Sequence, residues 1–170
     1  MCIRDSLWTV AIRIFKDHPV TGVGVENYSI YSPRYAGGPG KLTFVTFIAE
    51  KPHVVHNVYL QLAVETGLVG LGLFLAIVAS ALAAAMRAAR RFERRGDYED
   101  AALSRAVFVA VLAGLAASTF ISNANGFQIW VLLAFGPLLW RNAQREPEPA
   151  PVASPRAEGR LIRPAPAWQA

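Results

Sequence analysis

The sequence has one cysteine, Cys2, among 170 residues, which excludes a disulfide within the chain. Any part of the chain outside a membrane must therefore be held by packing alone. Charge is absent from the run LVGLGLFLAIVASALAAAM, residues 68–86. Together with 54% hydrophobic residues and a mean hydropathy of +0.31, this run indicates a membrane protein rather than a soluble domain.

Three apolar runs predict transmembrane helices, because about twenty helical residues cross a hydrocarbon core of roughly 30 Å. The third run is the shortest and must borrow length from the flanking NANG or RNAQ. Trp130 and Trp140 fit bilayer interfaces there, and Pro137 lies near its end, where a lost backbone hydrogen bond is least disruptive. The alternative is a buried helical hairpin in a soluble protein, but the first run has no polar stripe for a water-facing side. The predicted spans are residues 68–86, 106–122 and 124–140.

Arginine placement predicts the orientation of these helices. The connector at residues 87–105 holds six arginines, whereas the twenty-one residues before Leu68 hold one lysine, Lys51. The positive-inside rule therefore puts the connector in the cytoplasm and residues 7–67 outside. NANG becomes an external turn, and the Pro- and Ala-rich tail at residues 141–170 is expected to be cytoplasmic and disordered.

The opening residues 1–6, MCIRDS, have no helical, signal-peptide or start-transfer character. No span precedes Leu7, although the residues that follow it are predicted to lie outside the membrane. We therefore expect an adventitious leader on the C-terminal fragment of a longer membrane protein. The predicted fold class is an all-α integral membrane protein, in which an external loop precedes three transmembrane helices.

The net charge of +5 does not predict a nucleic-acid partner, because the positive residues are divided among connector, tail and external loop. The positive-inside pattern and anionic lipid headgroups account for this distribution more simply. Membrane lipids are therefore the expected partners of the charged residues.

In the external region, residues 7–15 place Trp8, Ala11, Ile12 and Phe15 on one face at helical spacing. This pattern predicts a short helix that lies on the membrane or on other helices. Further on, AGGPGK predicts a flexible loop. The apolar run LTFVTFI that follows it fits either a strand or a lid on the membrane surface.

The segment HPVTGVGVENY predicts a tight turn after that helix. Pro19 stops the helix, and Gly22 and Gly24 allow a backbone path that the β-branched Val23 and Val25 would resist. The stretch GVGVEN superficially resembles a phosphate loop, but it lacks the lysine and the strand-to-helix context of one. A structural turn is the favoured interpretation.

His56 opens the segment HNVYLQLAVETGLVG, which runs into the first span. Three roles compete for it: a structural histidine bonded to backbone, a metal ligand together with His53, or a general base that accepts a proton near neutral pH. Helical geometry turns Glu65 about 180° away from His56, which excludes an acid/base pair on one straight helix. Glu65 is instead expected to fix the loop from the other side. The pattern alone favours the structural role for His56.

Two motifs in order carry a resemblance to a known family. The motif W-x-x-A-x-x-I-F-x-x-H-P-V-T-G-V-G-V-x-N-Y precedes H-N-V-Y-L-Q-L-A-V-E-T-G-L-V-G and an apolar span. Over about residues 7–140 this succession resembles the C-terminal part of the O-antigen ligase/polymerase superfamily, in which a large periplasmic loop precedes the last spans. The positions that match the family's motifs are Trp8, Pro19, Gly22, Gly24, Asn27, His56, Asn57, Leu60, Glu65 and Gly67.

The resemblance implies an enzyme of the bacterial inner membrane that transfers a glycan from undecaprenyl diphosphate to an acceptor hydroxyl on the periplasmic side. It implies no cofactor and no metal. His56 matches the family's loop histidine and is predicted to be the catalytic base or to orient the acceptor, with Asn57 and Glu65 predicted to bind substrate. Arg34 is the best local candidate to bind the diphosphate, although a solvated loop arginine is an equal alternative. Lys41 and Lys51 are weaker candidates, and arginines that the family uses elsewhere would lie upstream.

Other functions stay open at this point. A polysaccharide polymerase and a protein O-oligosaccharyltransferase belong to the same superfamily and share its motifs. A non-catalytic, transporter-like membrane protein belongs to a different class, but a transporter is expected to place ionisable residues inside its spans. The three predicted spans contain none, which favours the enzyme. The partners expected for it are the lipid-linked glycan donor and a lipid-core or glycan acceptor.

Overall fold

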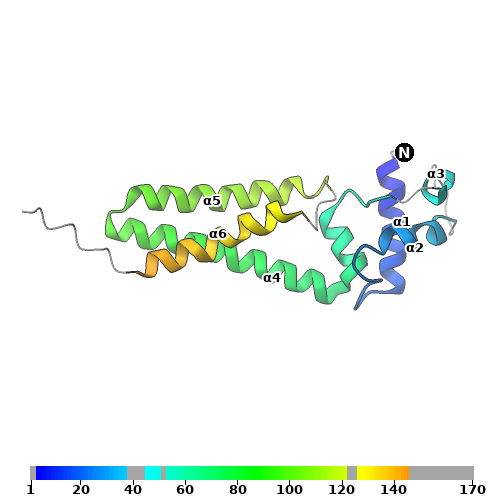
Figure 1. The fold of residues 1–170 in the computed structure, drawn as a ribbon, viewed down its shortest axis with the longest axis horizontal. Helices are drawn as coiled ribbons and strands as arrows, with labels where there is room; N and C mark the ends of the chain where they lie inside the picture. The colour runs from blue at the N-terminus through cyan, green and yellow to red at the C-terminus, as the bar shows by residue number, and fades with distance from the viewer. Residues whose placement is uncertain (1–2, 38–44, 51–52, 122–125, 146–170) are drawn as a thin grey trace, which may run out of the picture.

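The computed structural model describes residues 3–37, 45–50, 53–121 and 126–145, in which six helices are joined by turns and loops and no strand occurs. The prediction of an all-α fold is therefore confirmed for this part of the chain. Figure 1 shows α4, α5 and α6 running alongside one another as an elongated bundle, with α1, α2 and α3 gathered at one end. The helices are α1 (Ile3–Asp17), α2 (Tyr28–Ala36), α3 (Val45–Glu50), α4 (Val58–Arg95), α5 (Tyr98–Ala117) and α6 (Phe127–Gln144).

Two helices of the described chain, α4 and α5, are long and apolar enough to cross a membrane. The first expected span, residues 68–86, lies wholly within α4, and the second, residues 106–122, overlaps the end of α5. The third, residues 124–140, falls largely on α6, so a count of three spans stays a prediction. The expected connector, residues 87–105, is helical except for a turn at Gly96 and Asp97, where Gly96 has a positive φ of 83°.

Small side chains hold the bundle together. The buried face of α4 carries six alanines, and Gly136 of α6 lies so close to α4 that a Cβ there would be 2.3 Å from the carbonyl oxygen of Ala81. Apolar surface gains nothing by leaving lipid for another helix, so close van der Waals packing of small residues is what drives membrane helices together. The buried alanines of α4 are Ala63, Ala81, Ala84, Ala85, Ala88 and Ala89.

The N-terminal helix differs from its prediction in two ways. It begins at Ile3, so residues 3–6 are helical although MCIRDS showed no helical pattern, and Ser6 is buried. Its buried face is formed by Leu7, Val10, Ala11 and Ile14, whereas Ile12, predicted to lie on the packed face, is 45% exposed. The predicted packed face started at Trp8. In the structure the helix is rotated, so that the residues at positions i, i+3, i+4 and i+7 from Leu7 face the core.

Several predicted features lie wholly or partly outside the described residues. These are the AGGPGK loop, the start of LTFVTFI, the external turn at residues 123–125, and most of the predicted tail. Within LTFVTFI, the residues from Val45 onward are helical and belong to α3. At the other end, α6 continues to Gln144, four residues into the segment expected to be a disordered tail.

Candidate functional site

The loop between α1 and α2 crosses α4 at a kink. At Gly67 the backbone of α4 leaves the helical conformation, with φ 68° and ψ −167°, which separates residues 58–66 from the long helix that starts at Leu68. The N–H groups of Leu68 and Val69 therefore turn away from α4 and donate to the carbonyls of Pro19 (2.8 Å) and Val20 (3.4 Å).

The α4 carbonyls left free by the kink find partners in the same loop. The N–H of Val23 donates to the carbonyl of Val64 (2.9 Å), and that of Gly24 to the carbonyl of Glu65 (2.8 Å). Two helical hydrogen bonds are thus replaced by four bonds between the loop and α4. Buried backbone groups are costly to leave without partners, so the loop and the kink require each other.

Glycine is needed where these two backbones touch. A Cβ at Gly22 would lie 2.4 Å from the carbonyl carbon of Glu65, and a Cβ at Gly67 would lie 2.1 Å from the carbonyl oxygen of Val20. Both glycines also have a φ of +68°, which side chains disfavour. The glycines in GVGVEN and ETG therefore serve a structural turn, which confirms that interpretation of the first segment.

Glu65 fastens the loop from inside. Its side chain is 3% exposed, and its carboxylate accepts hydrogen bonds from the backbone N–H groups of Glu26 and Tyr28 and from the amide of Gln61 (3.4 and 3.5 Å). Burial raises the pKa of the Glu65 carboxyl above its ordinary value, while these hydrogen bonds partly oppose the rise. The prediction that Glu65 fixes the loop is confirmed.

His56 is exposed and has a left-handed backbone conformation, with a φ of 55°. This conformation costs about 1 to 2 kcal/mol for a residue with a Cβ and persists only where the surroundings impose it. The residues on either side are held firmly. Ahead of it, the indole N–H of Trp8 donates to the carbonyl of Val55 (3.0 Å). Behind it, the backbone N–H of Val58 donates to the carbonyl of Ser118 (2.9 Å).

Asn57 begins α4 as its N-cap. Its side-chain oxygen accepts a hydrogen bond from the N–H of Leu60 (3.0 Å), which satisfies one of the donors that a helix start leaves unpaired. One turn further on, the hydroxyl of Tyr59 donates to the carbonyl of Leu115 (2.8 Å). The His56 segment is therefore clamped between α1 on one side and the end of α5 on the other.

The structure singles out Arg4 as the cation on the same side of the molecule. Its guanidinium carbon lies 5.5 Å from the ring centroid of Trp8 and 5.3 Å from that of Phe120, and its buried Nε has no hydrogen-bond partner among the described residues. Trp8 also binds the carbonyl of Val55, the residue before His56. A single side chain, that of Trp8, thus contacts both the guanidinium of Arg4 and the backbone of the residue before His56.

Arg4 was not among the predicted site residues, because residues 1–6 were assigned to a leader. The available signal was spacing, since Arg4 and Trp8 are four residues apart and share a helix face. Arg34, the predicted cation, is exposed on α2, with its guanidinium 5.8 Å from the ring of Tyr31. Lys41 and Lys51 lie outside the described residues.

The structure gives no support to a metal site at His53 and His56. In the described part of the chain, no three His, Cys, Asp or Glu side chains lie close enough together to hold a metal ion. What the arrangement offers is an exposed imidazole on a rigid backbone and a guanidinium held on two aromatic rings. His56 lies just before the start of α4, and Arg4 of α1 contacts Phe120, which follows the end of α5.

Residues 3–75 match the family model described as O-Antigen ligase. The matched segment contains α1, the loop, the His56 segment and the kink at Gly67, and it ends inside the long part of α4. No curated protein and no solved structure matches the chain.

Proposed function

Because residues 3–75 match the family model described as O-Antigen ligase, we propose that the protein is a glycosyltransferase of the bacterial inner membrane. It transfers a glycan from undecaprenyl diphosphate to an acceptor hydroxyl in the periplasm. The observation that carries the proposal is the exposed His56, held in a left-handed conformation where an apolar helix bundle begins. A donor with a lipid tail and a polar reactive headgroup requires a site at such a boundary.

The reaction needs a base on one side and positive charge on the other. The acceptor oxygen attacks the anomeric carbon, the bond from that carbon to the diphosphate oxygen breaks, and the diphosphate leaves with the electron pair. The His56 imidazole takes the proton of the acceptor hydroxyl. The Arg4 guanidinium stabilises the negative charge that develops on the diphosphate, because it can donate two parallel hydrogen bonds to phosphate oxygens.

The predicted substrate-binding residues take different parts in this scheme. Asn57 uses its side-chain oxygen to cap α4, which leaves its amide nitrogen to contact a sugar or the acceptor. Glu65 is buried against the loop and acts on the substrate through the position of residues 18–27. Arg34 is the second choice for the diphosphate, because it is solvent-exposed and Arg4 is partly buried beside the His56 segment.

The test is complementation. The open reading frame that encodes this chain is expressed in a bacterium without its own ligase, and surface-glycan ladders are compared on gels at equal membrane abundance. His56→Gly removes the imidazole and relieves the positive φ at once, so we expect a protein at least as stable as wild type that gives no ladder. His18→Ala, which removes an exposed histidine from the loop, is the matched control and should retain the ladder.

The two arginines are compared in the same assay. We expect Arg4→Gln to reduce the ladder by about a hundredfold, the loss typical of one electrostatic contact to a developing charge, and Arg34→Gln to reduce it much less. A full ladder from His56→Gly would make this histidine structural and overturn the mechanism. If the wild-type protein instead lengthens free polymer, the activity is that of a polymerase. If it glycosylates protein, the activity is that of an oligosaccharyltransferase.

A further inference from the structure

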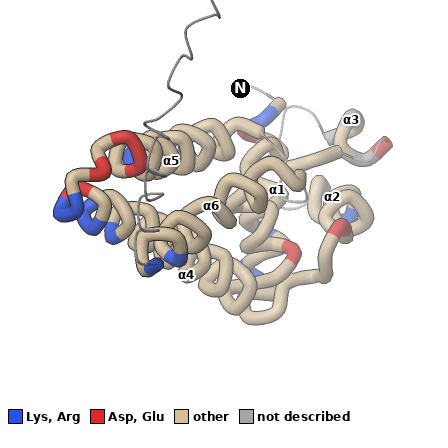
Figure 2. The backbone as a smooth tube through the Cα atoms, turned by 60° about the vertical axis from the view of Figure 1, so that its left-hand side comes forward, with Lys and Arg blue, Asp and Glu red and all other residues tan. Residues whose placement is uncertain are grey.

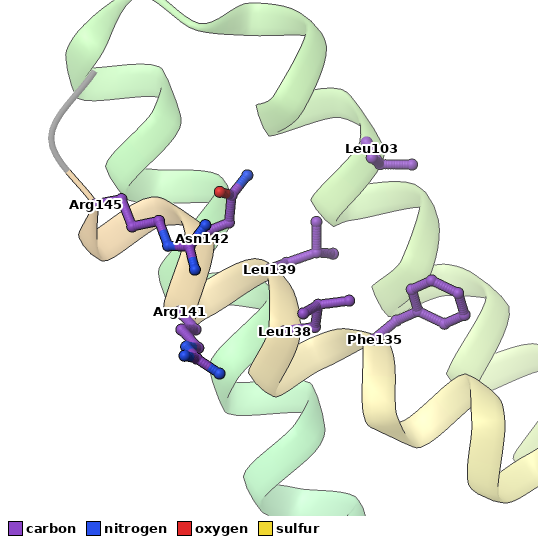
Figure 3. A pocket seen from close by; sticks show the side chains of 7 residues that line it. All are labelled: Leu103, Phe135, Leu138, Leu139, Arg141, Asn142 and Arg145. Atoms are coloured by element: carbon purple, nitrogen blue, oxygen red, sulfur yellow. The ribbon is translucent and has the colours of Figure 1, made fainter. Parts of the chain in front are cut away.

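A groove between α5 and α6 lies at the opposite end of the bundle from His56. Its volume is about 370 Å³, and its floor is formed by apolar side chains of both helices (Figure 3). Two of these side chains are open to the surroundings of the bundle, since Leu138 is 57% exposed and Leu103 is 52% exposed. The apolar lining consists of Leu103, Phe135, Leu138 and Leu139.

Positive charge lines one end of the groove. Arg141, Asn142 and Arg145 come from the last turn of α6 and the residue after it, and no carboxylate is among the lining residues. Figure 3 shows these three side chains on the last turn of α6, beyond the leucines. The end of α6 is held in place, because the guanidinium of Arg95 donates to the carbonyl of Arg145 (2.8 Å).

Among the described residues at this end, the acidic side chain of Glu93 forms an ion pair with Arg105, and neither of these two residues lines the groove. Figure 2 shows Lys and Arg gathered at this end of α4 and α6, whereas the middle of the bundle is free of charge. The groove therefore combines an apolar floor that points toward the uncharged middle of the bundle with two guanidinium groups at its outer end.

We propose that this groove binds one anionic phospholipid, whose phosphate contacts Arg141 and Arg145 and whose acyl chain lies along Leu103, Phe135 and Leu138. A guanidinium matches the geometry of phosphate oxygens, and arginines at a helix end reach the headgroup level of a bilayer while their stems stay in apolar surroundings. The acyl chain packs against the apolar side chains of the floor. The two arginine charges favour an anionic headgroup over a zwitterionic one. The site is separate from the glycan-transfer site and does not depend on its chemistry.

Native mass spectrometry of the 170-residue chain, released from detergent after incubation with phosphatidylglycerol or phosphatidylcholine, tests the proposal. We expect one retained phosphatidylglycerol and much weaker retention of phosphatidylcholine. Arg141→Gln with Arg145→Gln should lower the retention of phosphatidylglycerol roughly thirtyfold, as expected for two arginines at a membrane surface. Arg90→Gln with Arg94→Gln is the matched control, because it removes two exposed arginines at the same end that do not line the groove.

A second variant tests the apolar floor. Leu103→Trp fills part of the groove and should reduce retention of phosphatidylglycerol without any change in net charge. Equal losses in the two arginine pairs would mean nonspecific attraction to basic surface and would overturn the site. Equal retention of the two lipids by wild type would overturn anion recognition. A several-fold gain in retention on deleting residues 146–170 would make that segment the occupant and overturn the lipid assignment.

Discussion

Around His56, segments far apart in the sequence are joined by hydrogen bonds between backbones, whereas the α4–α6 bundle is joined by the packing of small apolar side chains. The loop at residues 18–27 exchanges four backbone hydrogen bonds with α4, and Trp8 and Tyr28 donate to main-chain carbonyls of Val55 and Leu7. In the bundle, the closest approach is Gly136 against Ala81. The hydrogen bonds between bundle helices come from side chains, such as Tyr59 to the carbonyl of Leu115, whereas the loop and α4 in the site region are held by hydrogen bonds from backbone to backbone.

The difference follows from what each region has to do. Backbone hydrogen bonds hold a segment at one register and in one orientation, which a site needs if its groups are to stay within tenths of an ångström of a productive geometry. The region has no disulfide available and a small buried core around α1. Van der Waals packing in the bundle requires only that the helices approach closely, and it leaves their outer faces apolar for lipid.

The largest effect is expected where the two backbones cross. Gly67 has a combination of φ and ψ that is essentially restricted to glycine, and an added Cβ would meet the Val20 carbonyl at 2.1 Å. We expect Gly67→Ala to destabilise the docked loop by about 3 kcal/mol or more and to abolish the glycan ladder. Limited proteolysis near residues 18–27 measures loop release. Gly72→Ala, which adds a Cβ into open space, should change neither result.

A smaller effect is expected in the bundle. Gly136→Ala pushes α6 away from α4, because its Cβ would lie 2.3 Å from the Ala81 carbonyl oxygen, and we expect a loss of about 2 kcal/mol. Thermal unfolding in detergent measures it, with Gly114→Ala as control, since a Cβ there meets Leu132 at an ordinary 3.6 Å. The protease protection of residues 18–27 should stay as in wild type. Its loss would show that the two regions are not independent.

The smallest effect concerns the buried carboxyl of Glu65. Its pKa in the folded protein lies above the ordinary value of 4.5, so the folded state holds the proton more tightly than the unfolded state does. The resulting stabilisation is fully present below pH 4.5 and is lost as pH rises through the folded-state pKa. We expect Glu65→Gln to remove this decline in thermal midpoint, and Glu99→Gln, an exposed acid at the far end, to retain it. A decline that persists in Glu65→Gln would assign it to another group.

Part of the site could be predicted because it depends on local pattern. The position of Glu65 on the side of its helix away from His56 follows from 100° per residue, and the structure confirms that Glu65 faces the loop. The uncharged runs likewise predicted helices, because a long apolar segment has few other ways to satisfy its backbone in lipid. These properties involve residues within a few helical turns of each other.

Other features depend on contacts between distant segments. Ile12 was assigned to the packed face and is exposed, because the rotation of α1 depends on which core it meets. The spacing of turn residues in the sequence could not show that Gly22 and Gly67, 45 positions apart, each lie against the backbone of the other's segment. Arg4 entered the site only because Trp8 and Phe120 come together around it.

By itself, therefore, the sequence determined that the long apolar runs are helical, that a tight turn follows the first helix, and which side of its helix Glu65 occupies. The tertiary structure alone decided that the turn at residues 18–27 fills the kink of α4, that His56 takes a left-handed conformation, and that Arg4 lies beside its segment. The physical reason is the distance along the chain over which each effect acts. Periodicity and backbone preference act over a few residues, whereas the register between two backbones is set only when a folded chain brings their donors and acceptors together.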